Sequence, residues 1–278
     1  MDWFSKGVLT AAMVAVVLFT ARGWGRRAAG WLAGLPVTSA PTIAWVALDH
    51  GSALAADAAV ASVAVCGLLA LVALVVALAL ARRRRAAMVA GVAAAAFGLM
   101  LPWLAMHGGL QGAMLAAVAG CALALWQWPK SAVRPRGAAG SWRSMLVTSA
   151  AAGLLSVVAA AAGPALGMAT AGWLASLPVV SGSAAAAVAA TGGAAAVVPF
   201  LHGYVLGLIG RIAFGAVFVL GLAYASLPTV LLLACASAVV CHLLAATVAA
   251  GLARSWALRK LAPCPLFTPP SRVPARPH

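Results

Sequence analysis

The amino-acid sequence predicts an all-α polytopic membrane protein with about nine transmembrane helices, arranged as two four-helix inverted repeats joined by a linker helix. Three observations predict this fold: an apolar composition, a repeated ten-residue block, and basic residues that gather in alternate loops. Of the 278 residues, 65% are hydrophobic and 8% are charged, whereas soluble domains carry roughly 25% charged residues. Apolar stretches of about 20 residues, enough to cross a bilayer, recur along the chain.

The repeated block indicates an internal duplication. Residues 30–39 read GWLAGLPVTS, and residues 172–181, which lie 142 positions later, read GWLASLPVVS. Eight of the ten positions are identical, and each copy continues through small residues to a glycine, Gly51 or Gly193. An alanine-rich composition does not explain Trp, Pro and Ser at matching offsets, so we interpret the two blocks as copies of one unit.

Hydropathy places the transmembrane spans. The third and eighth spans are long enough to tilt or kink. The first span follows Lys6 as a signal peptide would, but arginines follow it without a convincing cleavage site, so we expect a retained helix. The nine expected spans are 7–21, 28–48, 53–81, 86–106, 110–128, 144–163, 168–191, 194–223 and 228–253.

The basic residues predict the orientation of these spans. They follow the first, third, fifth and ninth spans, which puts them all on one side if the N-terminus is outside; the exception is Lys6. The positive-inside rule therefore predicts nine spans with the N-terminus outside and the C-terminus in the cytoplasm. The expected location is the bacterial inner membrane. The net charge of +15 is then interpreted as topogenic charge facing anionic lipid rather than as a nucleic-acid surface.

This orientation makes the two repeats inverted, because the first begins with an out-to-in helix and the second with an in-to-out helix. Inverted repeats are typical of many secondary transporters. The predicted organisation is a first transmembrane repeat at 1–109, a linker helix and cytoplasmic loop at 110–143, a second transmembrane repeat at 144–253, and a Pro-rich, disordered cytoplasmic tail at 254–278.

The repeated Gly-Trp-Leu-Ala-x-Leu-Pro-Val-x-Ser block resembles the signature of the small bacterial inner-membrane proteins related to GlpM. The resemblance covers each half separately, over 8–106 and 150–253, with Pro36 and Pro178 at the matching prolines. It implies a duplicated, fused form of a four-helix unit and carries no activity with it. The pairing of four-helix units also resembles the drug/metabolite transporter pattern, which is an analogy of fold.

Pro36 and Pro178 are candidate site residues, because each interrupts a helix at the same place in its repeat. The backbone carbonyls that a proline frees in a membrane need a partner; Ser39 and Ser181 follow three residues later and are candidates to supply it. Broken helices at corresponding positions indicate a transporter binding site. The alternative is a packing kink between closely approaching helices.

Charged and ionisable residues inside the spans are the other candidates. Asp57, a turn inside the third span, and Arg211, well inside the eighth, are expected to approach each other as a proton- or substrate-coupled pair. The alternatives are a structural salt bridge or an interfacial Asp57. His202 is either a proton relay or a hydrogen-bonded core residue, and it lies nine positions from Arg211, on the opposite face of the helix.

Motifs for catalysis and metal binding are absent from the sequence: it lacks HExxH, GxSxG, Walker and CxxC sequences. We therefore expect no enzyme, cofactor or metal, and no nucleic-acid partner. The leading hypothesis is a secondary transporter of a small solute, for which Arg211 favours an anion. The alternative is a non-transporting membrane scaffold or envelope-biogenesis factor. Expected partners are membrane lipid and the solute, and a homo-oligomer stays open.

Overall fold

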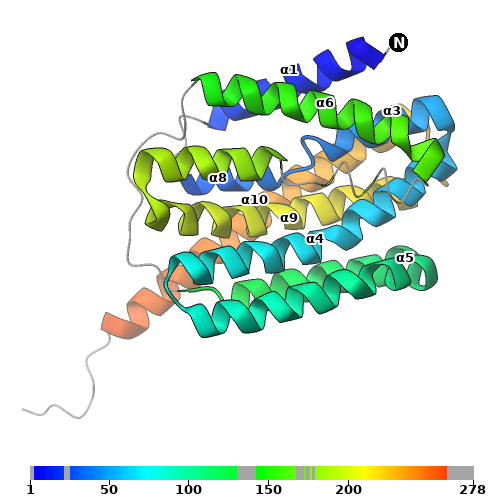
Figure 1. The fold of residues 1–278 in the computed structure, drawn as a ribbon. Helices are drawn as coiled ribbons and strands as arrows, with labels where there is room; N and C mark the ends of the chain where they lie inside the picture. The colour runs from blue at the N-terminus through cyan, green and yellow to red at the C-terminus, as the bar shows by residue number, and fades with distance from the viewer. Residues whose placement is uncertain are drawn as a thin grey trace, which may run out of the picture.

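The fold is a bundle of α-helices, seen in a computed structural model (Figure 1). The structure describes residues 3–21, 26–129, 142–166, 172, 176 and 179–261. This part of the chain is helical and contains no strand. The helices are α1 (Trp3–Ala21), α2 (Arg26–Gly34), α3 (Ser39–His50), α4 (Ser52–Leu80), α5 (Arg84–Trp126), α6 (Trp142–Leu166), α8 (Val179–Gly192), α9 (Ala194–Gly221) and α10 (Leu227–Leu261).

The predicted membrane character is confirmed at the level of helix length and hydropathy. In the described residues, five helical segments are long and apolar enough to cross a membrane. Shorter apolar helices cover Trp3–Val16, Met145–Ala161 and Val180–Ala190. The five segments are Ala29–His50, Ser52–Leu80, Gly108–Trp126, Ala194–Gly221 and Leu227–Ala245.

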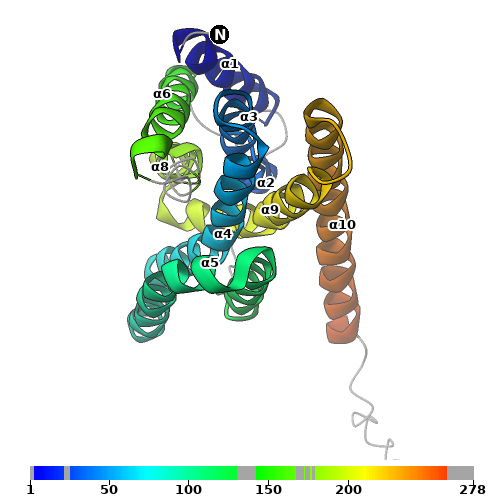
Figure 2. The same ribbon diagram turned by 90° about the vertical axis from the view of Figure 1, so that its right-hand side faces the viewer.

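The predicted division of the fourth and fifth spans lies inside α5. Gly109 has non-helical dihedral angles (φ 48°, ψ −144°), and the two arms of α5 fold back beside each other at this point (Figures 1 and 2). A positive φ is easy for glycine because it lacks a Cβ. The second arm then packs against α4, where Gly120 and Gly67 allow their backbones to touch.

The centre of the bundle is formed by α4 and α9. These two helices contact each other, and they separate α5 on one side from α1 and α6 on the other (Figure 2). The fully buried aromatic side chains Phe200, Phe214 and Phe218 all come from α9. Helices α2 and α9 run parallel, because Gly30 lies against Phe200 and Gly34 lies against Tyr204. The chain reverses between α3 and α4, so α4 and α9 run antiparallel.

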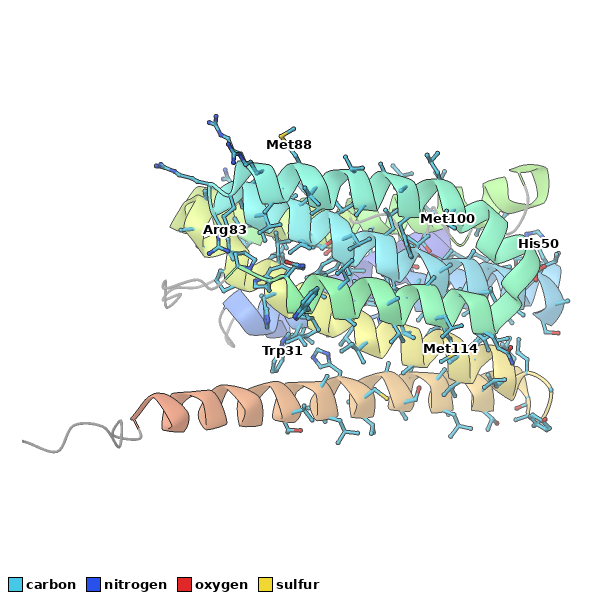
Figure 3. The ribbon with its side chains drawn as sticks, turned by 90° about the horizontal axis from the view of Figure 1, so that it is seen from below. Trp31, His50, Arg83, Met88, Met100 and Met114 are labelled. Atoms are coloured by element: carbon cyan, nitrogen blue, oxygen red, sulfur yellow. The ribbon has the colours of Figure 1, made fainter. Side chains whose placement is uncertain are left out.

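The two glycines that follow the repeated blocks, Gly51 and Gly193, have the same structural role. Gly51 separates α3 from α4 with φ 92° and ψ 166°, and Gly193 separates α8 from α9 with φ 72° and ψ 172°. Only glycine adopts this region of dihedral space readily. The ends of the bundle differ in charge: Arg83 lies at one end and His50 at the other (Figure 3).

Candidate functional site: a polar cavity between the repeated blocks

The first repeated block contains a helix break. After α2 ends at Gly34, residues 35–38 form a bend and a turn, and α3 begins at Ser39. Pro36 lies inside this break, where it has no N–H to continue the helical hydrogen bonds. A tight turn replaces them, with the Val37 N–H donating to the Leu35 carbonyl at 2.7 Å. The prediction that Pro36 interrupts a helix is confirmed.

The second repeated block is described at Gly172, Ser176 and from Val179 onward; Pro178 lies outside the described residues. Gly172 is helical and Ser176 is in a turn, and α8 begins at Val179. The Ser176 hydroxyl donates to the Gly172 carbonyl at 2.7 Å and is hydrogen-bonded to the Ser62 hydroxyl at 2.8 Å. The second block therefore approaches α4 as the first block approaches α9.

A small polar cavity lies between the two blocks and α9. The volume of this cavity is about 10 Å³, which is roughly the space that one water molecule requires. The first block lines it with Leu35, Val37 and Thr38, among others. The remaining side chains around the cavity come from the second block and α9, and most of them are polar: Ser176, Val180, Ser181, Tyr204 and Arg211.

Arg211 is the charged residue of this cavity. Its side chain belongs to α9 and is only 5% exposed. The guanidinium Nε and Nη1 atoms are buried without a hydrogen-bond partner in the described part of the chain. A guanidinium carries five N–H donors and stays protonated in proteins, and a buried charge is costly unless it is paired and hydrogen-bonded. The cavity therefore has a fixed positive charge and free donors.

Hydroxyl groups surround this charge. Tyr204 hydrogen-bonds through its side chain to Ser181, and it lies seven residues before Arg211, which brings both to the same face of α9. Thr38 stands at the end of the break in the first block, and its carbonyl accepts a hydrogen bond from the Thr42 hydroxyl at 2.8 Å. The predicted site residue Ser181 thus lies in the same cavity as Arg211.

Asp57 and Arg211 do not form the expected ion pair. Asp57 is exposed, while the adjacent Ala58 and Ala59 are buried. Gly215, one turn after Arg211, packs against Ala59 and Val63 of the antiparallel α4. Arg211 therefore lies level with a deeper part of α4, roughly two turns from Asp57. The sequence placed both residues on neighbouring helices but did not reveal their faces or their register.

Two other predicted residues lie outside the cavity. Ser39 begins α3 and is fully buried, but its hydroxyl has no hydrogen-bond partner among the described residues. Contrary to the expectation from the sequence, the Ser39 hydroxyl therefore does not donate to a carbonyl freed by Pro36. His202 packs its ring against Trp128, with ring centroids 5.3 Å apart. It is therefore turned away from Arg211, as the nine-residue spacing predicted.

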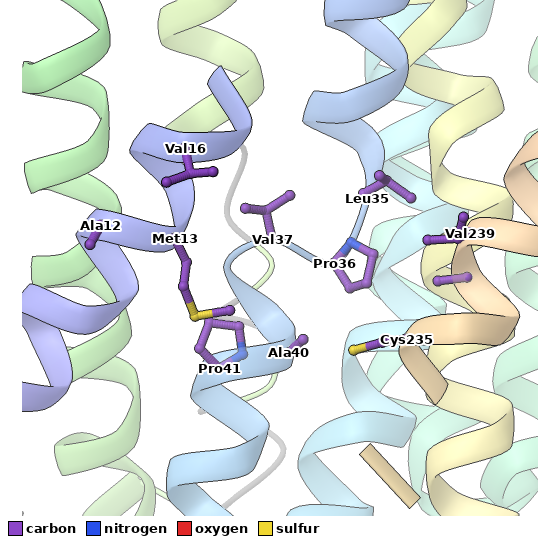
Figure 4. Close-up of a pocket in the computed structure, with 11 residues that line it drawn as sticks. Ala12, Met13, Val16, Leu35, Pro36, Val37, Ala40, Pro41, Cys235 and Val239 are labelled. Atoms are coloured by element: carbon purple, nitrogen blue, oxygen red, sulfur yellow. The ribbon is translucent and has the colours of Figure 1, made fainter. Parts of the chain in front are cut away.

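An open apolar groove lies on the other side of the break (Figure 4). It has a volume of about 480 Å³ and is lined by α1, the break, the start of α3 and α10, with Met13, Pro36 and Cys235 among its side chains. Leu35 and Val37 line both this groove and the polar cavity. The break therefore separates the apolar groove from the cavity that contains Arg211.

Lys6, the exception to the predicted charge distribution, is neutralised. It is 4% exposed and forms an ion pair with Asp49, at the end of α3. The ammonium also lies 4.6 Å from the centre of the Trp3 ring. The positive-inside rule counts Lys and Arg rather than net charge, so Lys6 remains the exception to the predicted charge distribution.

Tyr204, Thr38 and Ser176 were missed as site residues by the sequence reasoning. Tyr204 could have been found from its seven-residue spacing to Arg211. The ten-residue blocks differ at only two positions. Thr38 of the first block corresponds to Val180, and Ser176 of the second block corresponds to Gly34. The differences between the copies pointed to the cavity more directly than the identities.

Comparisons with known proteins leave the site to be interpreted from its own chemistry. No protein-family model, curated protein or solved structure matches this chain.

Proposed function

We propose that this protein is a secondary transporter of a small solute, built from two inverted repeats and resident in the bacterial inner membrane. The observation that carries the proposal is the small polar cavity between the repeated blocks, where Nε and Nη1 of Arg211 have no hydrogen-bond partner in the described part of the chain. Membrane proteins confine irregular backbone and buried charge to places where protein or a water-filled path satisfies them.

Reciprocal contacts support the inverted repeat. Gly30 lies against the backbone of Phe200, and Gly172 lies against the backbone of Ala58. Each residue of the second contact is 142 positions from its counterpart in the first. A twofold axis that exchanges the halves requires such exchanged pairs. The antiparallel α4 and α9 are consistent with an axis in the membrane plane. The proposal also includes nine transmembrane spans and an origin from a GlpM-like four-helix unit.

Side-specific accessibility tests the proposal without knowledge of the solute. In a variant without native cysteines, Ser181→Cys is treated with a small membrane-impermeant thiol reagent in right-side-out and in inverted vesicles. Alternating access predicts modification from both sides. The control Val188→Cys, fully buried further along α8, stays unmodified. Protection of Ser181→Cys from both sides in every condition that the protein survives would contradict transport through this cavity.

A membrane scaffold is the second candidate, because the apolar groove beside α10 has room for a partner's side chains. A scaffold needs no access to the cavity. It predicts that Ser181→Cys stays protected, while bulky substitutions in the groove, such as Ala12→Trp, abolish activity in the cell without altering folded yield. The same pair of variants therefore separates the two candidates.

A further inference from the structure

We infer that the cavity is a binding site for one small monovalent anion, held directly by the guanidinium of Arg211. This inference rests on the proposed function for its biological meaning, but the binding site itself is argued from the charges, donors and space around Arg211.

The first argument is charge. The sequence contains three acidic residues. Two of them are described: Asp49 is paired with Lys6, and Asp57 is exposed without an ion pair to Arg211. Neither neutralises the buried guanidinium. Because arginine cannot shed its proton under ordinary conditions, a negative charge from outside the described protein is the compensation that the site is built to accept.

The second argument is hydrogen bonding. Among the described residues, Nε and Nη1 of Arg211 have no hydrogen-bond partner, although Arg211 is only 5% exposed. The side chains of Ser181 and Tyr204 line the same space and hydrogen-bond to each other. This bond uses one of their two hydroxyl protons. An anion accepts from such donors, and charge-assisted hydrogen bonds of this kind are shorter and stronger than neutral ones.

The third argument is valence and size. Among the described residues that line the cavity, Arg211 is the one cationic side chain. A single negative charge therefore balances it, whereas a dianion leaves one charge uncompensated. The available space is about 10 Å³, close to that of one water molecule. These limits favour chloride, nitrate or formate over sulfate or an organic acid with a bulky body.

The repeat supports one such site in each chain. The residue 142 positions before Arg211 is Leu69, and the one before Tyr204 is Ser62. Leu69 is buried in the apolar core. The half that contains Leu69 therefore lacks the cationic group, and binding is expected with a stoichiometry of one anion per chain.

The test measures anion binding to the purified full chain in detergent. Sodium gluconate is replaced stepwise by sodium nitrate, formate or chloride at constant ionic strength, and the midpoint of thermal unfolding is recorded. A ligand that binds only the folded state raises this midpoint as its concentration rises. We expect the increase with the three small anions and not with sulfate. Equal responses to sulfate and nitrate would overturn the inference.

Variants assign the effect to Arg211. Arg211→Gln is expected to abolish the response, whereas Arg84→Gln, which removes an exposed arginine at the start of α5, is expected to preserve it. If Arg211→Gln does not fold, Tyr204→Phe serves instead: losing one hydrogen bond should raise the anion concentration needed by about fivefold. The inference is overturned if the unfolding midpoint of Arg211→Gln rises with the anion as fully as that of the parent. Where Arg211→Gln does not fold, an unchanged anion dependence in Tyr204→Phe overturns it.

Flux in proteoliposomes separates this inference from the transport proposal. Nitrate or formate binding in detergent without flux contradicts transport and leaves the anion site standing. Flux of any solute that is equal in the parent and in Arg211→Gln contradicts the role of Arg211 and leaves transport standing.

Discussion

At the scale of single residues, the two buried cationic side chains of the described protein differ in how they are compensated. Lys6 is paired with Asp49, whereas Nε and Nη1 of Arg211 have no hydrogen-bond partner among the described residues. The ion pair joins α1 to α3, at the end of the bundle away from Arg83. Paired and unpaired charges in the same apolar bundle have different expected responses to mutation.

Removing Asp49 should destabilise the protein more than removing Lys6. The Lys6 side chain is 6% exposed and the Asp49 side chain 25% exposed, so Asp49→Asn leaves the more deeply buried charge without a partner. We expect Asp49→Asn to cost roughly 1–3 kcal/mol of unfolding free energy and Lys6→Met to cost less. The double variant should regain part of the loss. Thermal unfolding of the detergent-solubilised protein checks this order, and equal losses in the two single variants would contradict it.

Asp57→Asn should have little effect on stability. The side chain is exposed and does not pair with Arg211, and surface substitutions usually change stability by within about 0.5 kcal/mol. The Asp57–Arg211 pair expected from the sequence would instead predict a large loss, because removing one partner leaves the other charge buried alone. The measurement is the unfolding midpoint of Asp57→Asn beside that of the parent. A loss of several degrees would restore the ion pair as the better description.

At the scale of elements, the glycine junctions and the break at Pro36 determine how each half folds. The sequence analysis noted Gly51 and Gly193 as the glycines that follow the two blocks, and both adopt the same glycine-specific conformation. The sequence identified them because a duplicated turn keeps its glycine. It also identified Pro36, because a missing N–H interrupts a helix in any context.

Gly51→Ala and Gly193→Ala should each destabilise the protein by about 1–3 kcal/mol, since alanine is strained in this region of dihedral space. Both sites have open space around the missing Cβ, so the loss reports on backbone conformation rather than on a collision. Gly91→Ala is the matched control: Gly91 is helical in α5, with open space as well. It should be neutral or stabilising by about 0.5–1 kcal/mol. Thermal unfolding of the three variants measures the contrast, and three equal outcomes would refute it.

At the scale of the whole molecule, hydropathy predicted where helices lie better than it predicted which faces meet. The bounds of α4 and α9 agree with the third and eighth predicted spans to within two residues. The pairing of Asp57 with Arg211 was not predictable, because α4 is apolar on all sides and its sequence does not mark the face that packs against α9. Tyr204 became visible as a site residue only when the blocks and α9 were seen around one cavity.

The proposed orientation makes a prediction for the whole chain. In a cysteine-free background, His50→Cys should react with an impermeant reagent from the periplasm, and Arg83→Cys should react only after the cytoplasmic side is opened. These residues lie at opposite ends of the bundle (Figure 3), and the arginines beside Arg83 are expected to remain inside. Labelling of both from the same side would remove the basis of the inverted repeat, and the reverse pattern would invert the orientation.

The different residues at positions 69 and 211 bear on why two such units would share one gene. In a pair of identical subunits every substitution occurs twice, so an arginine gained on one side of the axis is also gained on the other. Two guanidinium groups would then have to be accommodated in the core. In the proposed duplication, covalent fusion of the two halves removes that constraint, since Leu69 can stay apolar while Arg211 is acquired. Fusion thus lets natural selection alter one half without altering its twin.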